Sequence, residues 1–159
     1  MQVVYGGGST GLMGALADGA LEAGGRVEGV LPRFMDDKEL GHRGVSAMHV
    51  VDCMQSRLQK MLDDSHAFVA LPGGCGTLEE LFFVLTRKRL GLHAGPVVIM
   101  NFRGFFDPCL AMLERCVSER FMDKRHGAMW SVVEGPGEIV PALRTAPEWG
   151  AEHGRYAVP

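Results

Sequence analysis

Two glycine-rich segments carry the residues of this sequence that could do chemistry. Residues 71–80 read L-P-G-G-C-G-T-L-E-E and lie between an apolar run and a segment of helical period. Glycines leave backbone N–H groups open to an anion, and the positive end of a helix dipole attracts one. We expect the N–H groups of residues 74–77, with the Thr77 hydroxyl, to hold one phosphate group. No lysine follows the glycines, so the pattern is not that of a triphosphate-binding loop.

Glu80 is the carboxylate candidate beside this segment. A helix that opens at Thr77 places Glu80 in its first turn, where the carboxylate can face a sugar bound at the helix end. Thr77-x-x-Glu80 is also a capping-box pattern, in which the glutamate is structural, and this alternative stays open. Glu79 is rotated away by about 100° and is the weaker candidate.

Arg57 is the cationic candidate, on a predicted helix at 52–63 with Asp52 as its N-cap. The apolar stripe of this helix is formed by Met54, Leu58, Met61 and Leu62. Arg57 lies on or beside that stripe, and a guanidinium directed inward needs a carboxylate or phosphate partner. The alternative is an arginine whose stem packs on the apolar surface while its head reaches solvent.

The other glycine segment satisfies G-x-G-x-x-G at Gly6, Gly8 and Gly11, after a predicted strand and before a predicted helix. A dinucleotide site also needs an acid near the tip of the next strand, but Glu28 lies inside that strand. We therefore favour a loop that faces a phosphate or ribose, with Gly7 and Gly8 as contacts. A tight turn needed only for packing is the alternative.

Short apolar runs alternate with segments of helical period along the chain. Strands are predicted at 2–5, 26–31, 45–51, 66–71, 97–101 and 128–133. Helices are predicted at 11–23, 52–63, 77–90, 107–121 and 138–143, with a short one near 36–40. This alternation indicates an α/β, Rossmann-like three-layer fold with a mostly parallel sheet flanked by helices. We expect one nucleotide-binding domain over 1–144 and a frayed tail over 145–159.

Composition narrows the possible partners. The net charge of −3 gives no electrostatic reason to expect a nucleic acid or an anionic membrane. No apolar run approaches the ~20 residues of a membrane span, and no signal peptide is visible. The four cysteines form no C-x-x-C motif, and no histidine stands at a zinc-finger interval. We therefore expect free thiols, no metal site and a cytoplasmic location.

Taken together, these residues resemble the LOG (LONELY GUY) family of cytokinin riboside 5′-monophosphate phosphoribohydrolases, long labelled lysine decarboxylases. The family's P-G-G-x-G-T-x-x-E motif is matched by Pro72, Gly73, Gly74, Gly76, Thr77 and Glu80. The triple-glycine turn before a helix and the helical Arg57 match as well. The similarity extends to about residue 143, which makes it far more specific than either glycine motif alone.

The resemblance implies hydrolysis of an N6-modified adenosine 5′-monophosphate to the free base and ribose 5-phosphate, by a homodimer and without a cofactor. Arg57 and Glu80 are its implied catalytic pair. The implied substrate contacts are Glu39, Gly73, Gly74, Cys75, Gly76, Thr77, Leu78, Glu79 and Thr86. A decarboxylase would need a lysine for pyridoxal phosphate, and no lysine here has a supporting context.

A non-catalytic nucleotide carrier is the alternative function, because molybdenum-cofactor carriers share this fold and similar glycine turns. A carrier has no need of the Arg57 and Glu80 pair, which favours the enzyme. Leu58 stands where the family usually has lysine, and residues 86–89 are more basic than usual. The family also usually has a strand, a loop and a helix before the triple-glycine strand. We therefore expect a gap in the sheet beside strand 2–5, and weak stability or activity of this chain alone.

Overall fold

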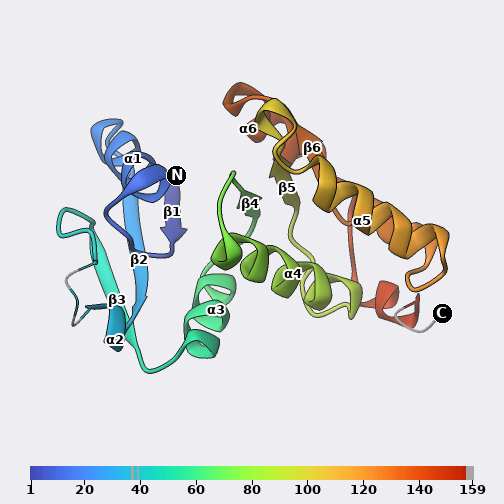
Figure 1. Cartoon of the computed structure of the whole chain (residues 1–159), viewed down its shortest axis with the longest axis horizontal. Helices are drawn as coiled ribbons and strands as arrows, with labels where there is room; N and C mark the ends of the chain where they lie inside the picture. The colour runs from blue at the N-terminus through green and yellow to red at the C-terminus, as the bar shows by residue number, and fades with distance from the viewer. Residues whose placement is uncertain (37, 39, 157–159) are drawn as a thin grey trace. The chain divides into compact units, whose positions relative to one another are not determined.

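The computed structural model describes residues 1–36, 38 and 40–156 (Figure 1). The chain divides into two compact units, Met1–Ser65 and His66–Pro159. Each unit contains one three-stranded sheet.

The first unit has the strand order β1-β2-β3, with both strand pairs parallel. Its strands are β1 (Gln2–Tyr5), β2 (Arg26–Pro32) and β3 (Ala47–Val51). Its helices are α1 (Gly11–Glu22), α2 (Arg33–Asp36) and α3 (Met54–Asp63). Helices therefore connect successive parallel strands, which is the expected βαβ arrangement.

The core of the first unit lies between α1 and the sheet. Tyr5, Ala17 and Val27 are buried there, and the neighbouring apolar side chains come from both α1 and the strands. Period 2 on the strands and period 3.6 on the helix bring these residues to a shared interface. The apolar face of α1 packs against the apolar face of the sheet. This packing fixes the position of the end of β1, where the first glycine segment begins.

The second unit has the strand order β4-β5-β6, again with both pairs parallel. Its strands are β4 (Phe68–Ala70), β5 (Val97–Met100) and β6 (Ser131–Val133). Its helices are α4 (Cys75–Arg89), α5 (Asp107–Ser118) and α6 (Ile139–Thr145). Short 3-10 turns lie at Phe102–Gly104, Lys124–Ala128, Pro136–Glu138 and Ala151–Tyr156.

The predicted α/β, Rossmann-like class is confirmed, because every described strand pair is parallel and helices flank both sheets. All six predicted strands are present, and the helices agree to within a few residues at their ends. Among the described residues β1 pairs only with β2, so it is an end strand of its three-stranded sheet.

The expectation of a frayed tail is wrong for the described part of the C-terminal segment. Trp149 is buried, and its indole Nε1 donates a 2.7 Å hydrogen bond to the main-chain carbonyl of Lys88. A large aromatic side chain with a satisfied N–H fixes the segment on α4. The sequence of the tail has no periodicity, so this anchor could not be inferred from pattern.

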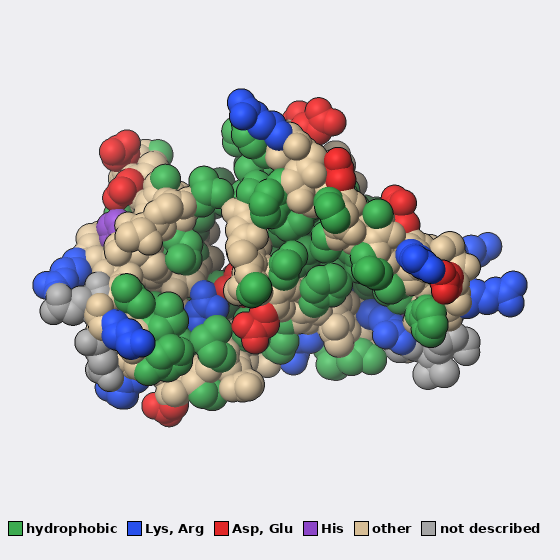
Figure 2. All heavy atoms as spheres, viewed as in Figure 1, with side chains coloured by type: hydrophobic (Ala, Val, Ile, Leu, Met, Phe, Trp, Pro, Cys, Tyr) green, Lys and Arg blue, Asp and Glu red, His purple; other side chains and the backbone are tan. Residues whose placement is uncertain are grey.

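On the face drawn in Figure 2, acidic and basic side chains are scattered among apolar ones. Among the described residues, no helix is long and apolar enough to cross a membrane. All four cysteines are described, and each is a free thiol, as predicted.

Candidate functional site

The second glycine segment forms the N-terminus of α4, and the helix begins at Cys75 rather than at the predicted Thr77. Gly74 is the N-cap, with extended backbone angles of φ −89° and ψ −156°. The Leu78 N–H donates to the Gly74 carbonyl at 3.1 Å, which is the i to i−4 bond of the first helical turn. The first N–H groups of a helix have no acceptor within it, so those of residues 75–77 point out of the helix end.

This helix end is open to a ligand. Gly74, Cys75 and Gly76 are all exposed. A Cβ placed on Gly74 or Gly76 would meet no heavy atom of the described chain within 4 Å. An anion can therefore approach the N–H groups at the positive end of the helix dipole without steric hindrance.

Gly73 has a different role in the same turn, because the side chain of Thr77 folds over it. A Cβ on Gly73 would lie 3.0 Å from Thr77 Cβ and closer still to Thr77 Oγ1. The missing side chain thus allows the Thr77 hydroxyl to stay inside the turn. Thr77 is half-buried.

Glu80 lies in the second turn of α4, as its sixth residue. The capping-box alternative is wrong, because the N-cap is Gly74 and a capping-box glutamate occupies the third helical position. Residues three and four apart are neighbours on a helix, and helical side chains tilt toward the N-terminus. Glu80 therefore follows Gly76 and Thr77 on one face of the helix, while Glu79 is exposed on another.

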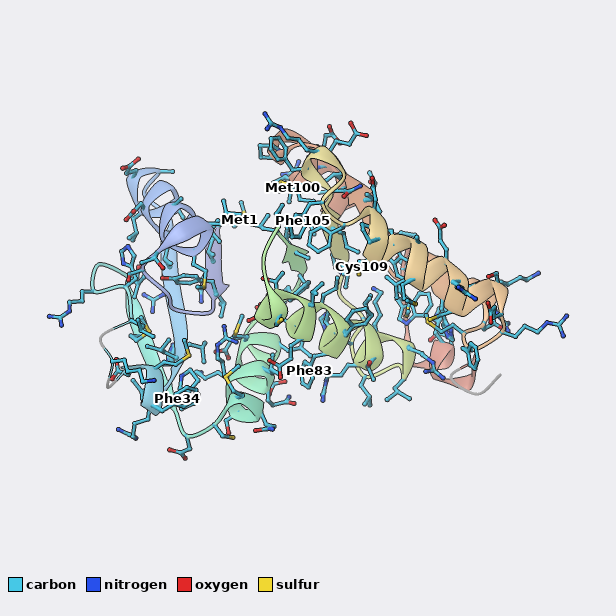
Figure 3. The ribbon with its side chains drawn as sticks, in the orientation of Figure 1. Met1, Phe34, Phe83, Met100, Phe105 and Cys109 are labelled. Atoms are coloured by element: carbon cyan, nitrogen blue, oxygen red, sulfur yellow. The ribbon has the colours of Figure 1, made fainter. Side chains whose placement is uncertain are left out.

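The other predicted substrate contacts on α4 differ in their exposure to solvent. Leu78 is half-buried and Thr86 is exposed near the other end of the helix. Phe82 is 41% exposed, although an inward position fits the apolar pattern. Phe83, labelled in Figure 3, lies under the guanidinium of Arg87, whose Cζ is 5.6 Å from the ring centroid.

Arg57 is buried on α3, with 7% of the residue exposed, so its head group does not reach for solvent. Its Nε donates to the main-chain carbonyl of Val30 in β2 at 3.2 Å. The N-cap of α3 is Cys53 rather than the predicted Asp52, because Cys53 Sγ accepts the Ser56 N–H. The guanidinium is thus held inside the first unit by a strand carbonyl.

The first glycine turn is a closed structure, in contrast to the second. Gly6, Gly7 and Gly8 are all buried. The Tyr5 hydroxyl donates to the Gly8 carbonyl at 3.1 Å, and the His42 N–H donates to the Gly7 carbonyl at 2.9 Å. Burial raises the pKa of Tyr5 to about 12, so this hydroxyl stays a donor at neutral pH.

Glu28 is engaged within the sheet by two side chains of its own unit. Its carboxylate lies 2.9 Å from His49 Nε2 and 2.9 Å from Arg26 Nε. The hydrogen bond from His49, followed by that from Arg26, holds the pKa of Glu28 below its ordinary value. Glu39, a predicted substrate contact, lies outside the described residues.

Lys88 is a buried cation that sequence reasoning missed. It is 1% exposed, and its Nζ donates to the main-chain carbonyl of Gly95 at 2.6 Å. Burial lowers the pKa of Lys88 to about 8. The run Arg87-Lys88-Arg89 is typical of a solvated helix end, and nothing in it distinguishes the middle residue. Within the described residues, no cluster of three or more His, Cys, Asp or Glu could hold a metal ion.

Comparison with known proteins gives one consistent result. A family model described as "Possible lysine decarboxylase" matches residues 13–143. A cytokinin riboside 5′-monophosphate phosphoribohydrolase of Rhodococcoides fascians is 45% identical over 123 residues, which are 77% of this chain. The LOG5 enzyme of that name from Arabidopsis thaliana is 40% identical over 143 residues, or 90% of this chain. A probable enzyme of that name, LOGL1 of Oryza sativa subsp. japonica, is 41% identical over 122 residues, or 77% of this chain.

The matched stretch covers 62%, 63% and 55% of the length of these three relatives, in the same order. The chain thus spans less than two thirds of the proteins it matches. The family model nevertheless extends over most of both units, from α1 to α6. The chain therefore belongs to the LOG family, whose family model carries the description of a possible lysine decarboxylase.

Proposed function

We propose that this chain hydrolyses the N-glycosidic bond of an N6-modified adenosine 5′-monophosphate, giving the free base and ribose 5-phosphate. The observation that carries the proposal is the N-terminus of α4. It offers open N–H groups at residues 75–77 and bears Glu80 one turn further along the same helix face. The names of the relatives support the same chemistry.

In this proposal the phosphate binds first and sets the position of the sugar. The N–H groups of residues 74–77, the Thr77 hydroxyl and the helix dipole hold a phosphate without a cationic side chain. A nucleoside 5′-monophosphate held by its phosphate extends its ribose away from the helix end. Binding energy from the unreactive phosphate then orients the reacting carbon, which raises the rate of the chemical step.

Glu80 is the proposed residue for the bond cleavage itself. Breaking an N-glycosidic bond develops positive charge on the sugar ring, as in other glycoside hydrolyses. A carboxylate stabilises that charge and orients a water molecule toward the anomeric carbon. Arg57 is the second proposed catalytic residue on the strength of the family resemblance, because a guanidinium can assist a departing purine.

Several further assignments belong to the same proposal. The proposed substrate contacts, in addition to the residues that hold the phosphate, are Gly7, Gly8, Gly73, Leu78 and Glu79. Glu39 and Thr86 are proposed contacts on the strength of the family resemblance. The proposal also includes a homodimer, a cytoplasmic location and no cofactor.

Incubation with AMP and with isopentenyladenosine monophosphate, side by side, tests the proposed function. Chromatography should show the free base, and ribose 5-phosphate should appear in equal amount. Adenosine, which lacks the phosphate, should react far more slowly because it cannot use the α4 N-terminus. Release of inorganic phosphate in place of ribose 5-phosphate would show a phosphatase. Saturable AMP binding without any turnover would favour the carrier.

A further inference from the structure

We propose that Gly6 is a positioning residue for Arg57, in addition to the residues assigned above. The main-chain carbonyl of Val30 and the bare Cα of Gly6 form a surface that we call the guanidinium seat. The role of the seat in catalysis rests on the proposed function, in which Arg57 is catalytic. The contacts that define it all lie within the first unit.

The seat holds the head group of Arg57 from two directions. Arg57 Nε donates to the Val30 carbonyl at 3.2 Å. A Cβ built on Gly6 would lie 3.2 Å from Arg57 Cζ and closer still to Nη2, well inside van der Waals contact. The guanidinium therefore lies directly against the Gly6 backbone, in space that any other residue would fill.

The conformation of Gly6 does not by itself require glycine. The positive-φ glycines of the first turn are Gly7, at +79°, and Gly11, at +61°. Gly6 is not among the glycines with positive φ, so an alanine could adopt its backbone angles. The missing Cβ is what matters at this position, and the atoms that use the space belong to Arg57.

The backbone around Gly6 cannot easily move to accommodate a larger residue at position 6. Tyr5 OH holds the Gly8 carbonyl, and the His42 N–H holds the Gly7 carbonyl. Tyr5 is itself part of the core of the first unit. Because the turn is fixed on both sides, an added methyl group must displace the guanidinium rather than the backbone.

This explains the difference between the two glycine turns. Gly74 and Gly76 have open space above them and leave it to a ligand, whereas Gly6 has its space occupied by a side chain. The G-x-G-x-x-G pattern of the first turn thus serves at Gly6 to hold a catalytic cation. In this chain, a glycine pattern typical of phosphate-binding loops also makes room for an arginine side chain.

Steady-state kinetics of Gly6→Ala, Arg57→Ala and the double variant test the proposal. Gly6→Ala should lower kcat by about 100-fold with little change in KM, because a misplaced catalytic group costs rate rather than binding. The double variant should be no slower than Arg57→Ala, since Gly6 acts only through Arg57. Gly19→Ala is the matched control, because a Cβ there meets no described heavy atom within 4 Å. Multiplicative losses in the double variant would overturn the proposal.

Chemical rescue gives a second test that a merely structural role would not produce. Free guanidinium at millimolar concentration should restore part of the activity of Arg57→Ala by occupying the empty seat. The same concentration should restore none in the double variant, because the methyl group introduced by Gly6→Ala fills that space. Equal rescue of both variants would contradict the seat.

Thermal melts separate failure of the inference from failure of the proposed function. Gly6→Ala should lower the melting temperature when Arg57 is present and leave it almost unchanged in the Arg57→Ala background. This coupling does not depend on any activity, so it holds even if no nucleotide is hydrolysed. Should Gly6→Ala fail to fold, the double variant should still fold, because the methyl group replaces the guanidinium. Equal destabilisation in both backgrounds would reject the seat.

Discussion

The indole Nε1 of Trp149 donates a 2.7 Å hydrogen bond to the main-chain carbonyl of Lys88, a residue 61 positions earlier. The Lys88 ammonium also lies 5.6 Å from the Trp149 ring centroid. Lys88 Nζ in turn donates to the carbonyls of Ala94 and Gly95, which lie before β5. The C-terminal segment, the end of α4 and the approach to β5 thus share one buried cluster. This cluster fixes the end of the helix whose other end bears the proposed phosphate site.

Trp149→Phe is expected to lower stability without unfolding the protein. The substitution keeps an aromatic ring but removes the N–H donor, which costs about 1 kcal/mol for a typical hydrogen bond. The melting temperature should fall by roughly 2–4 °C for a chain of this size. Calorimetry of this variant beside Phe121→Leu, at an exposed position, measures the effect. An unchanged melting temperature would show that the hydrogen bond from Trp149 to Lys88 adds nothing to stability.

Lys88 should make stability depend on pH in the mildly alkaline range. Its pKa is about 8 in the folded chain, against an ordinary value of 10.5. Between these values the unfolded chain holds more protons, so the free energy of unfolding rises with pH. The slope is at most about 1.4 kcal/mol per pH unit. Below pH 8 both states are protonated at Lys88 and this contribution is constant.

This slope is checked by urea titrations of wild type and Lys88→Met from about pH 7.5 to about pH 9.5. In this range the unfolded chain holds the extra proton. The range stops below the region where Tyr5, with its pKa of about 12, lowers stability as pH rises. Methionine keeps the length of the side chain but cannot be protonated, so its curve should be flatter than that of wild type. Lys124→Met, at an exposed position, should keep the wild-type slope. Identical slopes for wild type and Lys88→Met would exclude the effect.

The two neighbouring glycines of the second turn should respond differently to alanine. Gly73→Ala should lower the melting temperature, because its Cβ would overlap the Thr77 hydroxyl. Gly76→Ala should stabilise the chain by about 0.5–1 kcal/mol, since alanine favours a helix over glycine and meets open space. Its KM for AMP should nevertheless rise, because the methyl group stands in the proposed phosphate site. Thermal melts and initial rates on the same samples measure both effects. An unchanged KM for AMP would contradict phosphate binding at this helix end.

Glu80→Gln should abolish most of the turnover while leaving the fold intact. Glutamine is nearly isosteric but cannot carry the negative charge that the developing cation needs, and such groups contribute about 10²–10⁴-fold to a rate. The loss should appear in kcat, with AMP binding retained. Glu114→Gln, at an exposed position on α5, is the matched control in the same unit. Full turnover by Glu80→Gln would take Glu80 out of the mechanism.

Local pattern was a reliable guide to the elements and to the second glycine turn. The strand 2–5 was predicted at its observed bounds, and the N–H groups of residues 75–77 lie at a helix end as expected. Such features depend on residues within one turn or one strand. Hydrophobic period and glycine spacing are short-range properties, so they can be read from the chain directly.

The predicted helix ends and N-cap residues were less accurate. Several neighbouring residues can serve as an N-cap, and the sequence does not show which of them does. Cys53 rather than Asp52 caps α3, and α4 begins after a Gly74 cap rather than at Thr77. The second difference moves Glu80 from the first helical turn to the second and removes its structural explanation as a capping residue. One hydrogen bond, from Leu78 to Gly74, decides that question.

The sequence by itself determined the α/β class, the parallel strands and the helix end that could take a phosphate, because these follow from periodicity and from residue types close together in the chain. Only the tertiary structure decided that Gly6 lies under Arg57, that Lys88 is buried, and that Trp149 covers it. Each of these is a contact between segments far apart in sequence. The sequence around either residue of such a pair does not indicate the other residue, so these contacts follow only from tertiary packing.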